Sequence, residues 1–348
     1  MVEAIKNELH LQKDFLAGQS LQTIYFGGGT PSLLHENELE QLLTQIQKYF
    51  TVESNAEITL EANPDDLDRE KLATIKSMGI NRLSIGIQSF NDQRLRYLNR
   101  IHNGKEAVEV VENARKAGFE NLNCDLIYGI PAPDHQQWEQ DLMNMIKLAP
   151  NHISAYCLTI EPGTYFGRMV ERNKLKEADE EFAAGEYEIL VQQLENAGFQ
   201  HYEISNFARP GQLSRHNTSY WQGKPYLGVG PGAHSFNGNT RFFNVSNNAI
   251  YLKNIKAGQI PAEQEYLNKN QLINEYLMTT LRTQWGCDLD FIFQNYQLDL
   301  WNIEGEKLKA MISNGFIKQE KTVISLTGKG KLLADQIILE LFLDDQVL

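Results

Sequence analysis

The sequence predicts an α/β fold built on a parallel sheet. Over the first two thirds of the chain, short apolar runs alternate with amphipathic stretches of helical spacing. This order is typical of right-handed βαβ units, in which a helix connects two parallel strands. After about residue 262 the pattern changes to helices followed by two short apolar strands, which indicates a smaller α+β region.

Five strands are expected in the sheet, at residues 23–27, 57–62, 82–88, 121–128 and 152–160. Apolar residues at helical spacing predict a helix after each of the first four. These positions are Leu39, Leu42, Leu43, Ile46 and Phe50, then Leu72, Ile75 and Met78, then Ala107, Val110, Val111 and Ala114, and finally Trp138, Leu142 and Met145. Three helices end at a glycine that can adopt the left-handed conformation, namely Gly79, Gly118 and Gly198.

The C-terminal region resembles a winged-helix module. Helices are expected at 269–283 and 303–314, two strands lie around a charged turn within 315–327, and a final helix runs through 327–343. We therefore expect a barrel core at 1–165, an extension of the barrel at 166–261, and the winged-helix-like domain at 262–348.

Composition narrows the class of protein. The 348 residues carry a net charge of −13, whereas binding to a phosphate backbone needs clustered Lys and Arg, so nucleic acid is not an expected partner. No apolar run approaches the roughly 18 residues of a membrane span. The three cysteines, Cys124, Cys157 and Cys287, are odd in number and far apart, which is typical of a reducing compartment. These observations predict a cytoplasmic protein without a membrane span.

Polar or glycine residues stand at the predicted strand ends, where parallel α/β folds bind ligands. Gly28 and Gly29 leave backbone amides accessible and Thr30 adds a hydroxyl, although a tight turn uses the same residues. Glu61 is a carboxylate at an apolar strand end, where a helix cap or a surface salt bridge is the alternative. Gln88 can both donate and accept hydrogen bonds, and Gly86 in the same strand indicates close approach by another group.

Two further residues complete this set. Asn123 and Asp125 share one face of their strand, and the Asp125 carboxylate can accept from ribose hydroxyls or pair with a neighbouring strand. Arg100 can bind a ligand carboxylate in a fork geometry or remain solvated.

The succession GGGTP, LEANP, SIGIQSF, LNR and NCDLIYG resembles, in this order, the radical SAM core of the oxygen-independent coproporphyrinogen III oxidase family. The resemblance covers almost the whole chain and implies a partial (β/α)6 TIM-like barrel that binds S-adenosylmethionine (SAM). It implies that the glycines and Thr30 meet the methionine end and that Asp125 meets the ribose. Glu61, Gln88 and Arg100 would contact the polar groups of SAM that lie between its methionine end and its ribose.

The same family holds a [4Fe–4S] cluster through a Cys-x3-Cys-x2-Cys motif that precedes the GGGTP turn. Residues 1–25 contain no cysteine, so we expect a barrel that lacks its first strand and a chain without iron–sulfur ligands. Reductive cleavage of SAM needs an electron from that cluster, so radical chemistry is not expected of the chain as written. Cys124 and Cys157 are expected to be small core residues.

Past the barrel, the motif His-Asn-x-x-Tyr-Trp resembles the HemW-like heme chaperone branch of the family. It places His216, Tyr220 and Trp221 together, and His234 follows in a glycine-rich loop, so these four residues are the heme candidates. The resemblance implies a protein that receives heme and delivers it to recipient hemoproteins. The alternatives are a coproporphyrinogen III oxidase of porphyrin biosynthesis and a truncated fragment, and the sequence leaves open whether the chain forms a homodimer.

Overall fold

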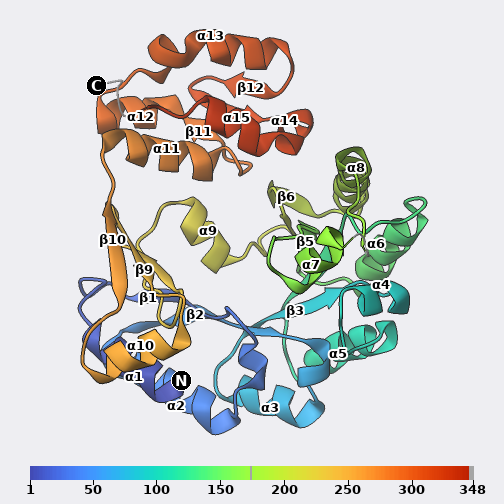
Figure 1. Ribbon diagram of the computed structural model, residues 1–348, viewed down its shortest axis with the longest axis vertical. Helices are drawn as coiled ribbons and strands as arrows, with labels where there is room; N and C mark the ends of the chain where they lie inside the picture. Colours follow the sequence, from blue (N-terminus) through green and yellow to red (C-terminus); the bar gives the residue numbers. More distant parts are fainter. Residues whose placement is uncertain (173–174, 345–348) are drawn as a thin grey trace. The chain divides into compact units, whose positions relative to one another are not determined.

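The computed structural model describes residues 1–172 and 175–344, which fold as two compact units. The sheet unit comprises Thr23–Glu36 and Glu57–Ser214, and the terminal unit comprises Met1–Gln22, Asn37–Ala56 and Arg215–Leu348. Figure 1 shows their helices and strands. No helix in the described ranges combines the length and apolar character that crossing a bilayer requires.

A seven-stranded sheet with the order β1-β2-β3-β4-β5-β7-β6 organises the sheet unit. Its strands are β1 (Leu21–Phe26), β2 (Val52–Ala62), β3 (Arg82–Gln88), β4 (Asn121–Tyr128), β5 (His152–Cys157), β6 (Gln200–Glu203) and β7 (Asn206–Ala208). Strands β2 to β5 pair in parallel, which confirms the predicted βαβ pattern. Strand β7 pairs antiparallel with β5 and β6, and neither β6 nor β7 was predicted from the sequence.

The helices of this unit alternate with the strands along the chain, and most of them lie outside the curved sheet (Figure 1). They are α3 (Arg69–Ser77), α4 (Asp92–Tyr97), α5 (Gly104–Lys116), α6 (Gln136–Leu148), α7 (Tyr165–Glu171) and α8 (Glu180–Asn196), with 3-10 turns η1 (Pro31–Leu33) and η2 (Pro64–Asp66). The three predicted helix-ending glycines adopt positive φ, at 97° for Gly79, 87° for Gly118 and 82° for Gly198, which confirms the left-handed helix ends.

One face of strands β2 to β5 is apolar and fully covered. Leu83 and Ile85 on β3, Leu122 and Cys124 on β4, and Ile153 on β5 are all completely buried. The helical stripes predicted from Ala107 to Ala114 and from Trp138 to Met145 are buried as well. Burial of these side chains stabilises the sheet unit, by about 25 cal/mol per Å² of apolar surface removed from water.

The terminal unit combines helices with a second sheet. Its first part contains α1 (Val2–Leu11), α2 (Glu36–Tyr49), α9 (Arg215–Trp221), α10 (Asn248–Lys256) and an antiparallel sheet of β8 (His234–Phe236), β9 (Thr240–Asn244) and β10 (Ala262–Tyr266). Glu8 of α1 is completely buried and accepts hydrogen bonds from Gly230 N at 2.8 Å and Asn244 Nδ2 at 2.6 Å. This carboxylate therefore fastens the glycine-rich loop to the first helix.

The C-terminal part is a small α+β domain, as predicted. It contains α11 (Lys269–Thr280), α12 (Leu289–Tyr296), α13 (Leu300–Ser313), α14 (Gly328–Leu332), α15 (Ala334–Glu340) and a sheet of order β11-β13-β12, formed by Cys287–Asp288, Val323–Leu326 and Ile317–Glu320. The single final helix expected at 327–343 was wrong, because the helix breaks at Leu333. Gly328 and Gly330 weaken this segment, and a β-carbon at Gly330 would lie 2.0 Å from the Phe316 carbonyl oxygen.

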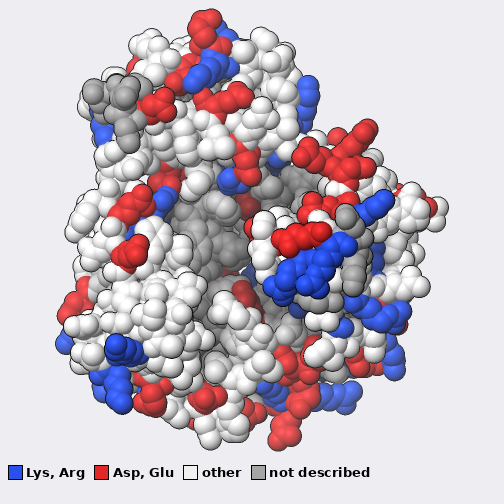
Figure 2. Space-filling view, viewed as in Figure 1, with Lys and Arg blue, Asp and Glu red and all other residues white. Residues whose placement is uncertain are grey.

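On the face of the molecule shown in Figure 2, acidic and basic side chains are interspersed. The excess of 45 Asp and Glu over 32 Lys and Arg gives the net charge of −13.

Candidate functional site

The second face of strands β2 to β5 is polar. Its register places in one row Glu61 of β2, Ser84 of β3, Asn123 of β4 and His152 of β5. One step further along, Asp125 aligns with Ser154. Because alternate residues of a strand share a face, the polar face predicted for Asn123 and Asp125 is confirmed and extends across four strands.

The Asn123 amide connects three of these strands. Its Nδ2 donates to Ser84 Oγ at 2.8 Å and to Asp125 Oδ1 at 2.7 Å. Its Oδ1 accepts from His152 Nδ1 at 2.7 Å and from Ser154 Oγ at 3.1 Å. Burial holds the pKa of His152 well below its usual range, so the ring is neutral at physiological pH. Every hydrogen-bonding group of the amide is used, which fixes its orientation.

Asp125 is a half-buried carboxyl on this face. Burial raises its pKa to about 6, and the nearby Glu61 carboxylate also raises it, whereas the hydrogen bond from Asn123 lowers it. The group therefore changes charge close to neutral pH, and a ligand that donates hydrogen bonds would favour its ionised form.

Within the described part of the chain, Glu61 neither caps a helix nor forms a salt bridge, which were the alternatives expected from the sequence. It accepts a hydrogen bond from the Tyr25 hydroxyl at 2.7 Å. A β-carbon at Gly27 would lie 2.6 Å from Tyr25 Cε1 and 2.9 Å from Glu61 Oε1, so the first glycine of the turn makes room for this pair. Tyr25 was not predicted as a site residue, because its only signal in the sequence is a polar hydroxyl at the end of an apolar strand.

The turn after β1 is exposed. Gly28 has a φ of 72° and Gly29 a φ of 135°, a conformation that side chains disfavour, while no atom lies within 4 Å of a β-carbon built on either residue. Thr30 follows and precedes η1 without capping it through its side chain. These residues leave open space beside the backbone of the turn.

Arg100 is joined to the same turn through two side chains. Its Nη1 donates to Asn63 Oδ1 at 3.2 Å, and Asn63 Nδ2 donates to Asp66 Oδ2 at 3.2 Å. The same Asp66 oxygen accepts from Ser32 Oγ at 2.6 Å, two residues after Thr30. Burial lowers the pKa of Arg100, while Asp125 opposes this change. The guanidinium is thus half-buried and held, rather than solvated at the surface.

Gln88 ends β3 next to a bulge, where its register partner on β4 is Leu126. It is buried, and its φ is 66°, in the left-handed region that glutamine rarely adopts. All seven SAM candidates therefore belong to the sheet unit and lie at or beside the carboxyl ends of its strands.

The four heme candidates belong to the terminal unit. The His216 ring meets Tyr220 edge-on at 4.9 Å, Tyr220 meets Tyr226 at 4.6 Å, and the Tyr226 ring lies 6.4 Å from Phe236. His234 is two residues before Phe236 in β8, so the two side chains share a face of that strand. The aromatic row thus begins at His216, and His234 lies on the same face of β8 as Phe236 at its other end.

Helix α9 and His234 are more exposed than core residues would be. Helix α9 contains no buried residue, although it carries Tyr220 and Trp221. The Trp221 Nε1 atom is buried and has no hydrogen-bond partner among the described residues. His234 is exposed and packs edge-on against Phe243 at 4.9 Å. Aromatic side chains here have room for further contact.

The described residues do not fit a [4Fe–4S] cluster. Among them, no group of three or more His, Cys, Asp or Glu side chains is arranged to hold a metal ion. Cys124 is a buried core residue, as expected, but Cys157 is exposed at the end of β5, because the strand stops there and leaves its last side chains uncovered. No step is therefore assigned to a cluster.

Comparisons with known proteins agree with this architecture. The family profile described as the radical SAM superfamily matches residues 2–143, and the HemN C-terminal domain profile matches residues 267–333. The solved structure of coproporphyrinogen III oxidase (HemN) from Escherichia coli, described as a radical SAM enzyme, superposes with a TM-score of 0.84 at 23% identity. It covers 98% of this chain and 82% of that one, which confirms the predicted fold.

Two curated relatives carry the name heme chaperone HemW. The protein of Bacillus subtilis (strain 168) is 35% identical over 319 residues, covering 91% of this chain and 84% of the relative. That of Haemophilus influenzae (strain ATCC 51907 / DSM 11121 / KW20 / Rd) is 34% identical over 351 residues, covering 99% of this chain and 89% of the relative. With this identity over nearly its whole length, the chain belongs to the HemW family within the radical SAM superfamily.

Proposed function

We propose that this protein binds heme and delivers it to recipient hemoproteins. The observation that carries the proposal is the 35% identity over 91% of the chain to a protein named as a heme chaperone. The aromatic row from His216 to Phe236 supports it, because heme binding needs an apolar aromatic surface and an axial nitrogen or sulfur.

In this proposal His216 is the preferred axial ligand. Its ring already stands edge-on to Tyr220, and Trp221 follows on the same short helix. His234 is the second candidate, since it is exposed and shares a strand face with Phe236. Neutral imidazole is a common ligand for heme iron.

The polar face of the sheet unit is the proposed SAM site. Gly28, Gly29 and Thr30 would receive the methionine end, and the Asp125 carboxylate would accept from the ribose hydroxyls. Glu61, Gln88 and Arg100 would contact the polar groups of SAM between its methionine end and its ribose. The fit rests on an open glycine turn, a half-buried guanidinium, and the carboxyl groups of Glu61 and Asp125 on the polar face of the sheet. In this proposal these residues would bind and orient SAM, and no reaction step is assigned to it.

The oxidase alternative has no separate support. The structural likeness to coproporphyrinogen III oxidase is at 23% identity, and this degree of likeness establishes a common fold without a common reaction.

Titration with hemin, followed by absorbance, tests heme binding. We expect a saturable Soret shift in the wild type that is lost in His216→Ala, or in His234→Ala if that residue is the ligand. His10→Ala is the matched control, because His10 is an exposed histidine of the same unit whose ring lies tilted against Tyr49 at 5.2 Å, outside the aromatic row. Absence of a specific shift in folded wild-type protein, or an equal loss in all three variants, contradicts heme binding at this row.

A further inference from the structure

Gln88 lies at the centre of a strained three-residue turn. The Ser89 amide donates to the Ile87 carbonyl at 2.8 Å, across a residue whose φ is 66°. A hydrogen bond between residues i and i+2 around a positive φ defines the rare form of the γ-turn, which is strained for any residue with a side chain. Such strain persists only where surrounding contacts determine the conformation.

The Gln88 side chain folds back over its own strand. A β-carbon at Gly86 would lie 2.7 Å from Gln88 Nε2, so any other residue at position 86 would displace the amide. The bulge between Ile85 and Gln88 turns the strand end at the same place. The glycine at position 86 and the bulge in the strand therefore both determine where the Gln88 side-chain amide lies.

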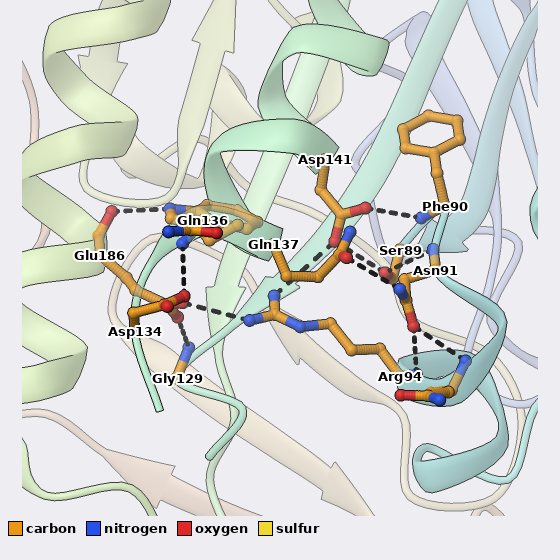
Figure 3. Close-up of polar contacts among 12 residues, drawn as sticks. Ser89, Phe90, Asn91, Arg94, Gly129, Asp134, Gln136, Gln137, Asp141 and Glu186 are labelled. Carbon is orange, nitrogen blue, oxygen red and sulfur yellow. Dashed lines mark hydrogen bonds and ion pairs between the residues drawn. The ribbon is translucent and has the colours of Figure 1, made fainter. Parts of the chain in front are cut away.

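Two buried side chains hold the turn from either side. On the side that follows Gln88, Asp141 of α6 accepts from Ser89 Oγ at 2.7 Å and from Phe90 N at 2.9 Å (Figure 3). On the side that precedes it, His102 Nε2 donates to the Ile87 carbonyl at 3.1 Å, because that oxygen can only accept. The His102 Nδ1 atom faces Asp65 at 3.6 Å.

Asp141 is itself held in place by charge. Arg94 of α4 lies 3.7 Å from Asp141 and 3.4 Å from Glu186 of α8 (Figure 3). Glu186 accepts from Gly129 N at 2.6 Å, directly after β4. The two carboxylates are completely buried. The Arg94 guanidinium therefore connects the turn that follows β3 with the turn that follows β4. These two strands are neighbours in the sheet.

We propose that Asp141 and His102 are positioning residues, which hold the strained turn so that the Gln88 amide is directed at a ligand before the ligand binds. The inference rests on the proposed SAM site, to which Gln88 belongs. Neither residue touches that ligand in this scheme. They act through Ser89, Phe90 and the Ile87 carbonyl, and they offset the strain that the turn would otherwise release.

The test combines hydrogen exchange with SAM titration, using the full chain and the variants Asp141→Asn, Ser89→Ala and His102→Ala. In Asp141→Asn we expect amides of residues 87–91 to exchange about tenfold faster, as for loss of one charged buried hydrogen bond, while β4 amides are unchanged. The Kd for SAM should rise by a similar factor. Ser89→Ala removes a single bond and should show the same pattern to a smaller extent, which keeps the test valid if Asp141→Asn folds poorly.

Glu8→Gln is the matched control, because Glu8 is an equally buried carboxylate that accepts from a backbone amide in the terminal unit. It should lower the melting temperature without changing exchange at 87–91 or the Kd for SAM. Unchanged exchange at 87–91 in Asp141→Asn, or equal acceleration throughout β4, overturns the inference. If the wild type binds no SAM but Asp141→Asn still exchanges faster at 87–91, the positioning role is supported. Only the proposed SAM site is then overturned.

Discussion

Asn123 donates a hydrogen bond to Asp125, two residues further along the same strand, over 2.7 Å. This contact favours the ionised carboxyl, yet burial is the larger effect and raises the Asp125 pKa to about 6. The balance between the two makes the charge of this group sensitive to pH and to a ligand.

The affinity for SAM should therefore depend on pH. Ribose hydroxyls donate to the ionised carboxyl, so binding must displace a proton once the pH is below the pKa of Asp125. We expect the affinity to be constant above about pH 6 and to fall by up to about tenfold per pH unit below it. Calorimetric titration between about pH 5 and pH 7 measures this, and Asp125→Asn should bind more weakly with no slope in this window. A flat wild-type profile contradicts the role of Asp125.

The hydrogen bond between Tyr25 and Glu61 should stabilise the fold. Tyr25→Phe leaves the Glu61 carboxylate without this donor, and we expect the free energy of unfolding to fall by about 1–2 kcal/mol in urea denaturation. Tyr266→Phe is the control, since Tyr266 is 76% exposed, and its effect should stay within about 0.5 kcal/mol. Equal effects of the two variants would show that the partly buried hydrogen bond between Tyr25 and Glu61 contributes nothing.

Removing the backbone strain at Gln88 should increase the stability of the protein. Glycine adopts a φ of 66° readily, so Gln88→Gly should raise the free energy of unfolding by about 1 kcal/mol and weaken SAM binding. Gly86→Ala should destabilise the wild type, because its β-carbon meets the Gln88 amide, but should be tolerated in the Gln88→Gly background. Additive effects of the two substitutions would contradict the contact.

Glu8 should be essential to the stability of the terminal unit. Glu8→Ala removes the acceptor of the Gly230 amide and the Tyr251 hydroxyl and one of two acceptors of the Asn244 amide, and we expect a loss of about 3 kcal/mol in chemical denaturation. Glu3→Ala, at an exposed position of the same helix, should cost less than about 0.5 kcal/mol. A loss below about 1 kcal/mol in Glu8→Ala would indicate that water replaces the carboxylate.

Local patterns in the sequence predicted much of this structure. Alternation along 121–128 predicted the strand end to end and the common face of Asn123 and Asp125, because side chains alternate with a period of two. Gly86 predicted close approach by another group, and that group is the side chain of Gln88 in the same strand. These features depend on neighbours within a few residues.

Contacts between distant segments could not be predicted from the sequence. Tyr25 and Glu61 are 36 residues apart, and Ser89 and Asp141 are 52 apart, so their pairing depends on how the strands and helices assemble. The antiparallel strands β6 and β7 are four and three residues long, too short for periodicity to identify. The assignment of SAM and heme residues stays a prediction, which the experiments above test.

Strands β2 to β5 have one face packed against helices and one face lined by polar groups. Adjacent positions along a strand are therefore under different physical constraints. Substitution at Leu122 or Cys124 would disturb the packed core, whereas substitution at Asn123 or Asp125 would change the hydrogen bonds of the polar face. Alternate residues of one strand thus allow the core and the polar face to be altered separately.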